Sequence, residues 1–91
     1  MGFRRFASTV WENVVKHQGE KFYTKTGISY TYVVREDYIL VNNDRRRKIT
    51  KEMLERAALI ENPLPAKLQQ ENIWGPSYAY GIITDKRITQ R

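Results

Sequence analysis

The chain has 91 residues, 41% of them hydrophobic, and a net charge of +6, values that fit one folded domain and exclude a disordered segment. It contains no cysteine, which excludes disulfides and cysteine-ligated metal sites. No stretch approaches the roughly 18 consecutive apolar residues of a membrane helix, and no apolar segment follows the basic start of the chain, as in a secretory signal. We therefore expect one soluble cytoplasmic domain over residues 1–91, without a membrane role.

Residues 3–18 are predicted to form a helix, because apolar side chains recur in this segment at helical spacing. Its apolar face would carry Phe6, Val10 and Val14. The sequence is compatible with two start positions for this helix. A capping box of Thr9 and Glu12 would begin it near residue 10, and without that cap it would begin near Gly2. Gly19 suits the position after the helix, because glycine adopts the left-handed backbone conformation without steric cost.

The period of the pattern then changes to two, which predicts three antiparallel strands over residues 21–24, 28–34 and 38–41. Gly27 supplies the positive φ of a tight turn between the first two strands. One face of the second strand would carry Ile28, Tyr30, Tyr32 and Val34. Because two tyrosines share this face with aliphatic residues, we assign most of the strand tyrosines to the core.

Helical segments follow the strands. Thr50 is the expected N-cap of a helix that stops before Pro63, because proline disfavours a helical conformation in the residue that precedes it. Residues 66–71 are expected to form one helical turn. Residues 78–85 fit a strand or a helix, and Ser77, a suitable N-cap, favours a short helix.

Together these elements predict a small single domain of the α+β class. It would contain an N-terminal helix, a three-stranded antiparallel meander, and one or two C-terminal helices packed on the sheet. Residues 86–91 are expected to form a mobile tail. The core candidates are Phe6, Val10, Val14, Phe22, Tyr32, Leu40, Leu54 and Ile82.

No catalytic motif is visible. One histidine and no cysteine exclude a Cys–His pair and a histidine-rich metal site. Glu36 or Asp37 would have to meet Asp44 in space to form an acid/base or Mg²⁺ pair, and we interpret all three as solvated turn residues, since turns favour such side chains. We therefore predict a protein that is not an enzyme and that uses no metal and no cofactor; an enzyme whose site forms no motif is the remaining alternative.

The most informative feature is a basic run, which with one further lysine gives five cations in seven residues: Arg45, Arg46, Arg47, Lys48 and Lys51. The run leads as a loop into the N-terminus of the predicted second helix, where free backbone N–H groups and the helix dipole favour phosphate. Arginine binds phosphate through two parallel N–H bonds. The alternative is a solvated loop that Asp44 and Glu52 partly neutralise.

We therefore predict a nucleic-acid-binding domain that contacts the phosphate backbone through this basic loop. Arg4, Arg5 and Lys25 would extend the surface if the fold brings them to the same side. Double-stranded DNA is favoured over single-stranded RNA as the partner, because most tyrosines are assigned to the core. Tyrosines exposed on an open sheet face would undermine that preference.

The alternative prediction is a protein-interaction or homo-oligomerisation module with no nucleic-acid role. Trp74 and Tyr78 flank a rigid Gly-Pro turn, and both are residue types favoured at interfaces. The third strand, residues 38–41, would allow edge-to-edge pairing in a homodimer. For Trp74 itself we favour packing on the core, because a small domain needs its large apolar side chains.

Overall fold

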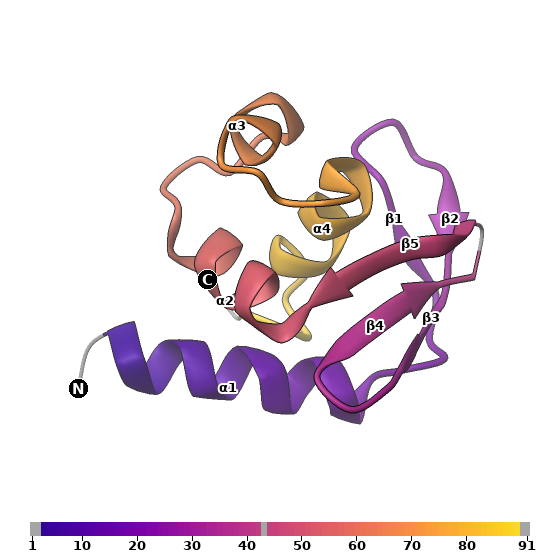
Figure 1. Ribbon diagram of the computed structural model, residues 1–91, viewed down its shortest axis with the longest axis horizontal. Coiled ribbons are helices and arrows are strands. Elements are labelled where there is room, and N and C mark those ends of the chain that lie inside the picture. The colour runs from indigo at the N-terminus through magenta and orange to yellow at the C-terminus, as the bar shows by residue number, and fades with distance from the viewer. Residues whose placement is uncertain (1–2, 43, 90–91) are drawn as a thin grey trace.

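The computed structural model describes the backbone of residues 3–42 and 44–89, and the side chains of residues 9–42 and 48–89. Its elements are α1 (Phe3–Lys16), β1 (Phe22–Tyr23), β2 (Ser29–Tyr30), β3 (Tyr32–Val34), β4 (Tyr38–Val41), β5 (Asp44–Thr50), α2 (Lys51–Leu59), α3 (Pro65–Gln70) and α4 (Pro76–Ile83) (Figure 1). The predicted α+β class, with an N-terminal helix, a three-stranded antiparallel sheet and C-terminal helices packed against it, is confirmed.

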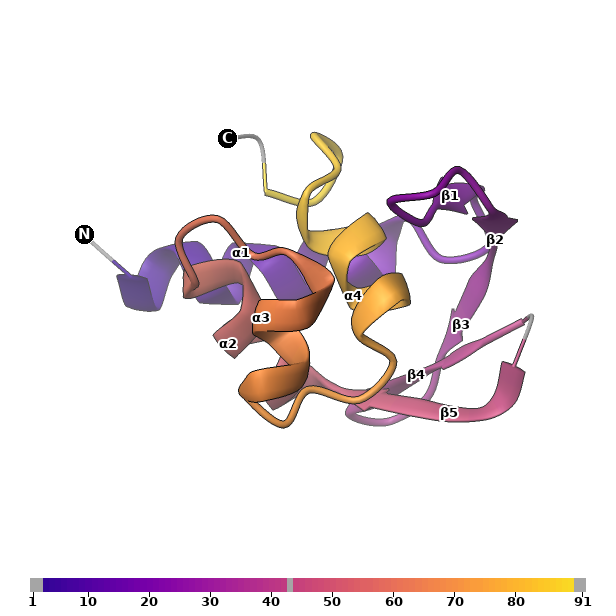
Figure 2. The same cartoon turned by 90° about the horizontal axis from the view of Figure 1, so that it is seen from above.

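The strands form two sheets. One is antiparallel with the order β3-β4-β5, and the other is the short antiparallel pair β1-β2. Seen from above, α4 lies between the β1-β2 pair and the other C-terminal helices, and α1 runs behind them (Figure 2). The helices therefore cover one side of the three-stranded sheet.

The strands that form the three-stranded sheet are not the three that were predicted. The expected strand over residues 28–34 is interrupted at Thr31 and divided between the two sheets. The third strand of the larger sheet is β5, which contains the basic run that the sequence led us to expect as a loop. Strand formation depends on pairing with neighbouring strands, so a run of charges can pair with β4 although its own composition does not favour a strand.

The core confirms most of the predicted residues: Val10, Val14, Phe22, Tyr32, Leu54 and Ile82 have no exposed surface. The prediction for Leu40 is wrong, since Ile39 and Val41 face the core instead and Leu40 is half-buried. The strand reads Tyr-Ile-Leu-Val, and four apolar residues in a row do not reveal which alternate pair points inward. The side chain of Phe6 lies outside the described residues.

The helix boundaries follow local signals closely. Of the two starts considered for α1, the earlier one is close to the observed start at Phe3. Gly19 has the left-handed conformation expected after this helix, with φ at +85°. Thr50 caps α2 as predicted, and its hydroxyl accepts a hydrogen bond of 3.1 Å from the backbone N–H of Met53.

The ambiguous segment near the C-terminus is a helix, α4, as favoured from the sequence. Its N-cap is Gly75, with φ at +56°, so Ser77 does not cap it. Gly81 lies where α4 packs against β1, and a Cβ atom there would overlap the carbonyl oxygen of Tyr23 and the hydroxyl of Tyr30. The contact between α4 and the first hairpin therefore requires glycine at position 81.

The end of the chain packs on the domain up to residue 89, unlike the mobile tail expected from residue 86 onward. Ile88 is fully buried and Thr89 is 7% exposed. The amide of Asn13 in α1 donates a 2.9 Å hydrogen bond to the carbonyl oxygen of Ile88. Residues 90–91 lie outside the described part of the chain.

Arg87 holds this segment in place through several contacts. Its guanidinium donates hydrogen bonds of 2.9 to 3.0 Å to both carboxylate oxygens of Asp85, to Glu20 and to the carbonyl of Lys21. The same group lies 3.9 Å from the ring centroid of Phe22. Hydrogen bonds from Arg87 hold the pKa of Asp85 below its usual value, and bonds from His17 and Arg87 do the same for Glu20.

Arg87→Gln should lower the free energy of unfolding at pH 7 by about 1 kcal/mol, because it removes charge-assisted hydrogen bonds and a cation–π contact. A carboxyl group whose pKa is lower in the folded than in the unfolded protein stabilises the fold at pH values above its unfolded-state pKa. This stabilisation is lost as the pH falls through the folded-state pKa. The difference between variant and wild type should therefore shrink below about pH 4. Urea unfolding at pH 7 and pH 3 measures this difference in the free energy of unfolding, and Lys86→Gln, at an exposed position, is the control. An equal difference at both pH values would contradict the prediction.

Candidate nucleic-acid interface

The three-stranded sheet has one face toward the helices and one face toward solvent. Inward-pointing residues Ile39, Val41 and Ile49 are fully buried. The register pairs Val33 with Leu40 and Leu40 with Lys48, on the opposite face. We call this the outer face; its described residues are Thr31, Val33, Arg35, Tyr38, Leu40, Asn42, Lys48 and Thr50.

The outer face combines cations, an aromatic ring and apolar surface. Val33 is 41% exposed, and Arg35 and Lys48 are exposed. The ammonium nitrogen of Lys48 lies 4.6 Å from the ring centroid of Tyr38, which is half-buried. None of the eight outer-face residues is acidic, and among the described side chains neither Arg35 nor Lys48 forms an ion pair. The face therefore carries positive charge that no described carboxylate neutralises.

A hollow of about 150 Å³ lies in this face. Its walls are Val33, Arg35, Leu40, Val41 and Asn42. Aliphatic side chains form much of this lining, and the guanidinium-bearing Arg35 belongs to the same lining. Apolar surface and a cationic side chain therefore adjoin in this hollow.

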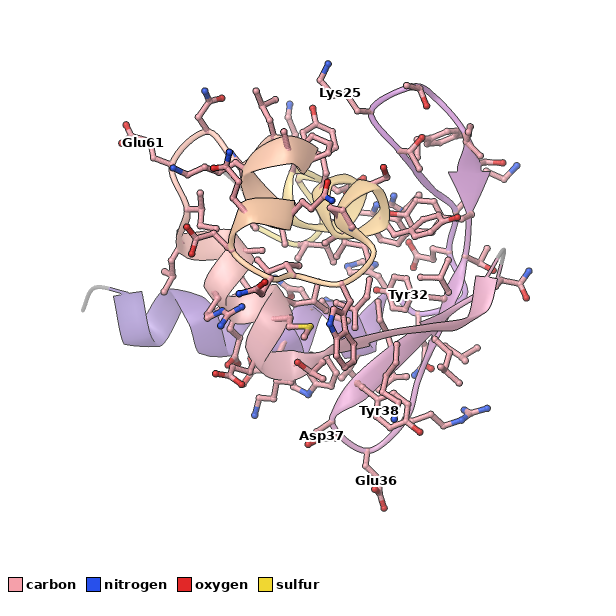
Figure 3. All side chains as sticks on the ribbon, turned by 45° about the horizontal axis from the view of Figure 1, so that its top comes forward. Lys25, Tyr32, Glu36, Asp37, Tyr38 and Glu61 are labelled. Carbon is pink, nitrogen blue, oxygen red and sulfur yellow. The ribbon has the colours of Figure 1, made fainter. Side chains whose placement is uncertain are left out.

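The acidic residues nearest this face lie at one end of it. Glu36 and Asp37 are exposed in the turn between β3 and β4, close to Tyr38 (Figure 3). Asp44 begins β5 at the opposite end of β4, where it pairs with Val41. The backbone therefore places these acids at opposite ends of β4, and the side chain of Asp44 lies outside the described residues.

The basic run belongs to a strand and not to a loop, which corrects the prediction. β5 ends at Thr50, so the strand leads directly into the N-terminus of α2. Between Leu40 and Val41 the register shifts, because their partners are Lys48 and Asp44, and residues 45–47 lie in this irregular stretch. The side chains of Arg45, Arg46 and Arg47 lie outside the described residues.

The structure brings some of the predicted site residues together. Lys48 lies on the outer face, and Lys51, which is exposed, follows three residues later as the first residue of α2. The backbone N–H of Lys51 donates a 2.8 Å hydrogen bond to the carbonyl of Asp37, which ties the start of α2 to the β3–β4 turn. Arg35, which follows β3 and is exposed, joins them as a residue that the site prediction missed.

Other predicted site residues lie elsewhere. Arg4 and Arg5 belong to the first turns of α1, at the end of the molecule opposite the start of β5, and their side chains are outside the described part (Figure 1). Lys25 is exposed at the tip of the β1–β2 hairpin, far from Tyr38 (Figure 3). The fold therefore does not gather these three cations with the basic run.

The Trp74–Tyr78 surface of the alternative prediction is partly exposed. Trp74 is 50% exposed, so the preferred packing of this ring on the core is wrong. An open hollow of about 410 Å³ borders it, and a second one of about 240 Å³ borders Tyr78 and includes Ile28 of the first hairpin. The expected edge pairing through residues 38–41 is also wrong, because β4 is the central strand of its sheet.

The part of the chain that the structure describes contains neither a metal-binding cluster nor a membrane-spanning helix. In that part of the chain, no group of three or more His, Asp or Glu side chains is arranged to hold a metal ion. Likewise, none of the helices described is both long and apolar enough to cross a membrane. Comparison with known proteins found no matching family model, no matching curated protein and no matching solved structure.

Proposed function

We propose that the protein binds nucleic acid by contacting phosphate groups with the basic run of β5 and the cations of the outer face. The observation that carries this proposal is the position of Lys48. It connects the basic run to the outer face, is exposed, and has the Tyr38 ring as its described contact. A cation on an open surface, with no ion-pair partner among the described side chains, attracts an external anion.

The charge density of the segment supports a polyanion as the ligand. Five cations in seven residues repel one another, at about 1 kcal/mol for each close pair in water. Phosphates relieve this repulsion and release their own counterions on binding. The strand also ends at the N-terminus of α2, whose dipole adds to the attraction for an anion near Lys51.

The test is fluorescence anisotropy of labelled oligonucleotides over a series of salt concentrations, with the triple variant Arg45/Arg46/Arg47→Ala. On duplex DNA the logarithm of affinity should fall by about 0.9 per neutralised phosphate for each tenfold rise in salt, and by about 0.7 on a single strand. We expect the variant to bind at least about tenfold more weakly and to lose two to three units of this slope.

The control is Lys21/Lys67/Lys86→Ala, which removes the same charge from exposed positions outside the outer face. It should keep most of the affinity. Equal losses in both variants would show attraction by net charge alone. Absence of binding at low salt would refute the proposal.

A second candidate function is association with a protein through Trp74. The observation in its favour is the 50% exposure of this indole beside an open hollow, since large exposed aromatic rings are typical anchors of interfaces. Self-association of this kind would give a mass that rises with concentration in sedimentation experiments. Trp74→Ala would abolish the rise, whereas the arginine variant would leave it unchanged.

A further inference from the structure

We infer that the nucleic acid taken by the outer face is single-stranded, with an unpaired base stacked against Tyr38 and over the adjoining hollow. This inference rests on the proposed function, and it names the form of nucleic acid that the face fits. It follows from the surroundings of Tyr38, from the shape of the face and from the distribution of charge around it.

Tyr38 lies on the one face of the sheet that helices leave open. Its ring is half-buried and is in contact with Lys48 at 4.6 Å. Val33 and Leu40 line the hollow on the same face. An aromatic ring beside exposed aliphatic surface is suited to stacking with the π-face of a base, which every base possesses.

A duplex does not offer such a base. Its bases are stacked on one another and present only their edges in the grooves, so a ring on a sheet can stack on them only after they unpair. No helix projects from the outer face to enter a groove, because this face consists of the side chains of β3, β4 and β5. The face therefore favours an unpaired strand.

The preference for duplex DNA rested on the assignment of most strand tyrosines to the core, and these tyrosines differ in their positions. Tyr30 and Tyr32 are in the core, where each hydroxyl donates a 2.6 Å hydrogen bond, to the carbonyls of Tyr78 and Val14 respectively. Tyr38 instead lies on the open face beside a lysine. Its position there reverses the preference for duplex DNA that sequence analysis derived from an assignment of most tyrosines to the core.

The charges indicate the path of the strand. Lys48 on β5 and Arg35 at the end of β3 lie on either side of β4, which carries Tyr38. Glu36 and Asp37 are exposed in the β3–β4 turn between Arg35 and Tyr38, so they repel phosphates that would extend beyond these two residues past the end of the sheet. The phosphates are therefore attracted across the strands from the basic run toward Arg35, and the base between them reaches Tyr38.

The experiment compares three labelled probes of about 12 units, within the range that single-strand sites cover: oligo(U) RNA, oligo(dT) DNA and a duplex DNA. Each is titrated with wild type, Tyr38→Leu and Tyr38→Phe. Tyr38→Leu keeps apolar bulk and removes the ring, whereas Tyr38→Phe keeps the ring. Tyr23→Leu is the matched control, because Tyr23 is 54% exposed on the other sheet. Circular dichroism verifies that each variant is folded.

We expect at least one single strand to bind more tightly than the duplex. Tyr38→Leu should weaken that binding by at least about fivefold with an unchanged salt slope, since stacking is lost while phosphate contacts remain. Tyr38→Phe and Tyr23→Leu should bind like the wild type. The RNA and DNA arms show which of the two single strands is preferred.

The outcomes separate this inference from the proposed function. If the wild type binds no probe at low salt, the proposed function fails. If it binds and the arginine variant weakens binding, but the duplex binds as tightly as the single strands or Tyr38→Leu has no effect, phosphate binding stands and the stacking inference is overturned.

Discussion

Gly81→Ala should lower the free energy of unfolding by about 3 kcal/mol or make the protein insoluble. In the structure a methyl group at this position would overlap the carbonyl oxygen of Tyr23 and the hydroxyl of Tyr30. A backbone oxygen cannot move away as the end of a flexible side chain can, so α4 would have to separate from β1. Urea unfolding monitored by circular dichroism measures the loss.

The sign of this effect is informative. Helix propensity alone favours alanine over glycine inside a helix by about 1 kcal/mol. Stabilisation by Gly81→Ala would therefore show that α4 does not pack on the first hairpin as it does here. Gly19→Ala is the control. Apart from its chain neighbours, no described residue has an atom within 4 Å of the added methyl group, so only the backbone conformation, φ +85°, opposes the substitution, at about 1 kcal/mol.

Tyr32→Phe should lower the free energy of unfolding by about 2 kcal/mol. The hydroxyl of Tyr32 donates a buried 2.6 Å hydrogen bond to the carbonyl of Val14, in the last turn of α1, where carbonyls lack helical donors. Removing the hydroxyl leaves that carbonyl buried without this donor. Burial raises the pKa of Tyr32 above its usual value, so the hydroxyl stays protonated and remains a donor in neutral solution.

Tyr23→Phe is the matched control for this substitution. Tyr23 is 54% exposed and no hydrogen bond of its hydroxyl is found among the described residues, so the variant should be as stable as the wild type. Thermal unfolding of both variants at pH 7 gives the comparison. Equal stability of Tyr32→Phe and wild type would mean that the hydroxyl does not hold α1 to the sheet.

These two contacts explain why the outer face is available. Tyr32 joins α1 to β3, and Gly81 allows α4 to approach the first hairpin closely. Both contacts lie on the inner side of the strands. With the helices held there, the side chains that alternate outward, among them Tyr38 and Lys48, remain open to solvent.

Local signals in the sequence were sufficient for α1, for the start of α2 and for two of the turns, although the N-cap of α4 is Gly75 and not Ser77. Thr50 caps α2 through its own hydroxyl, and Gly19 and Gly27 supply positive φ where turns need it. These features depend on residues within four positions along the chain. The apolar positions of α1 were equally predictable, because a helix that packs on a core repeats its buried residues at a spacing set by its own geometry.

The strands and the site depended on residues far apart in the sequence. The basic run forms β5 because β4 pairs with it, and nothing within the run itself indicates a strand. Leu40 faces outward because the register puts Ile39 and Val41 on the core. Such pairings are set by tertiary packing, where a shift of one residue moves every side chain to the other face.

The sequence by itself determined the α+β class, the approximate positions of the helices with the Thr50 cap of α2, and the cations of residues 45–51, since composition and local hydrogen bonding specify them. Only the tertiary structure decided that Lys48 lies over Tyr38, that Arg35 shares their face, and that Arg4, Arg5 and Lys25 lie elsewhere. The reason is physical: local hydrogen bonds and periodicity act over a few residues, whereas the composition of a surface depends on strand register and on how the helices pack.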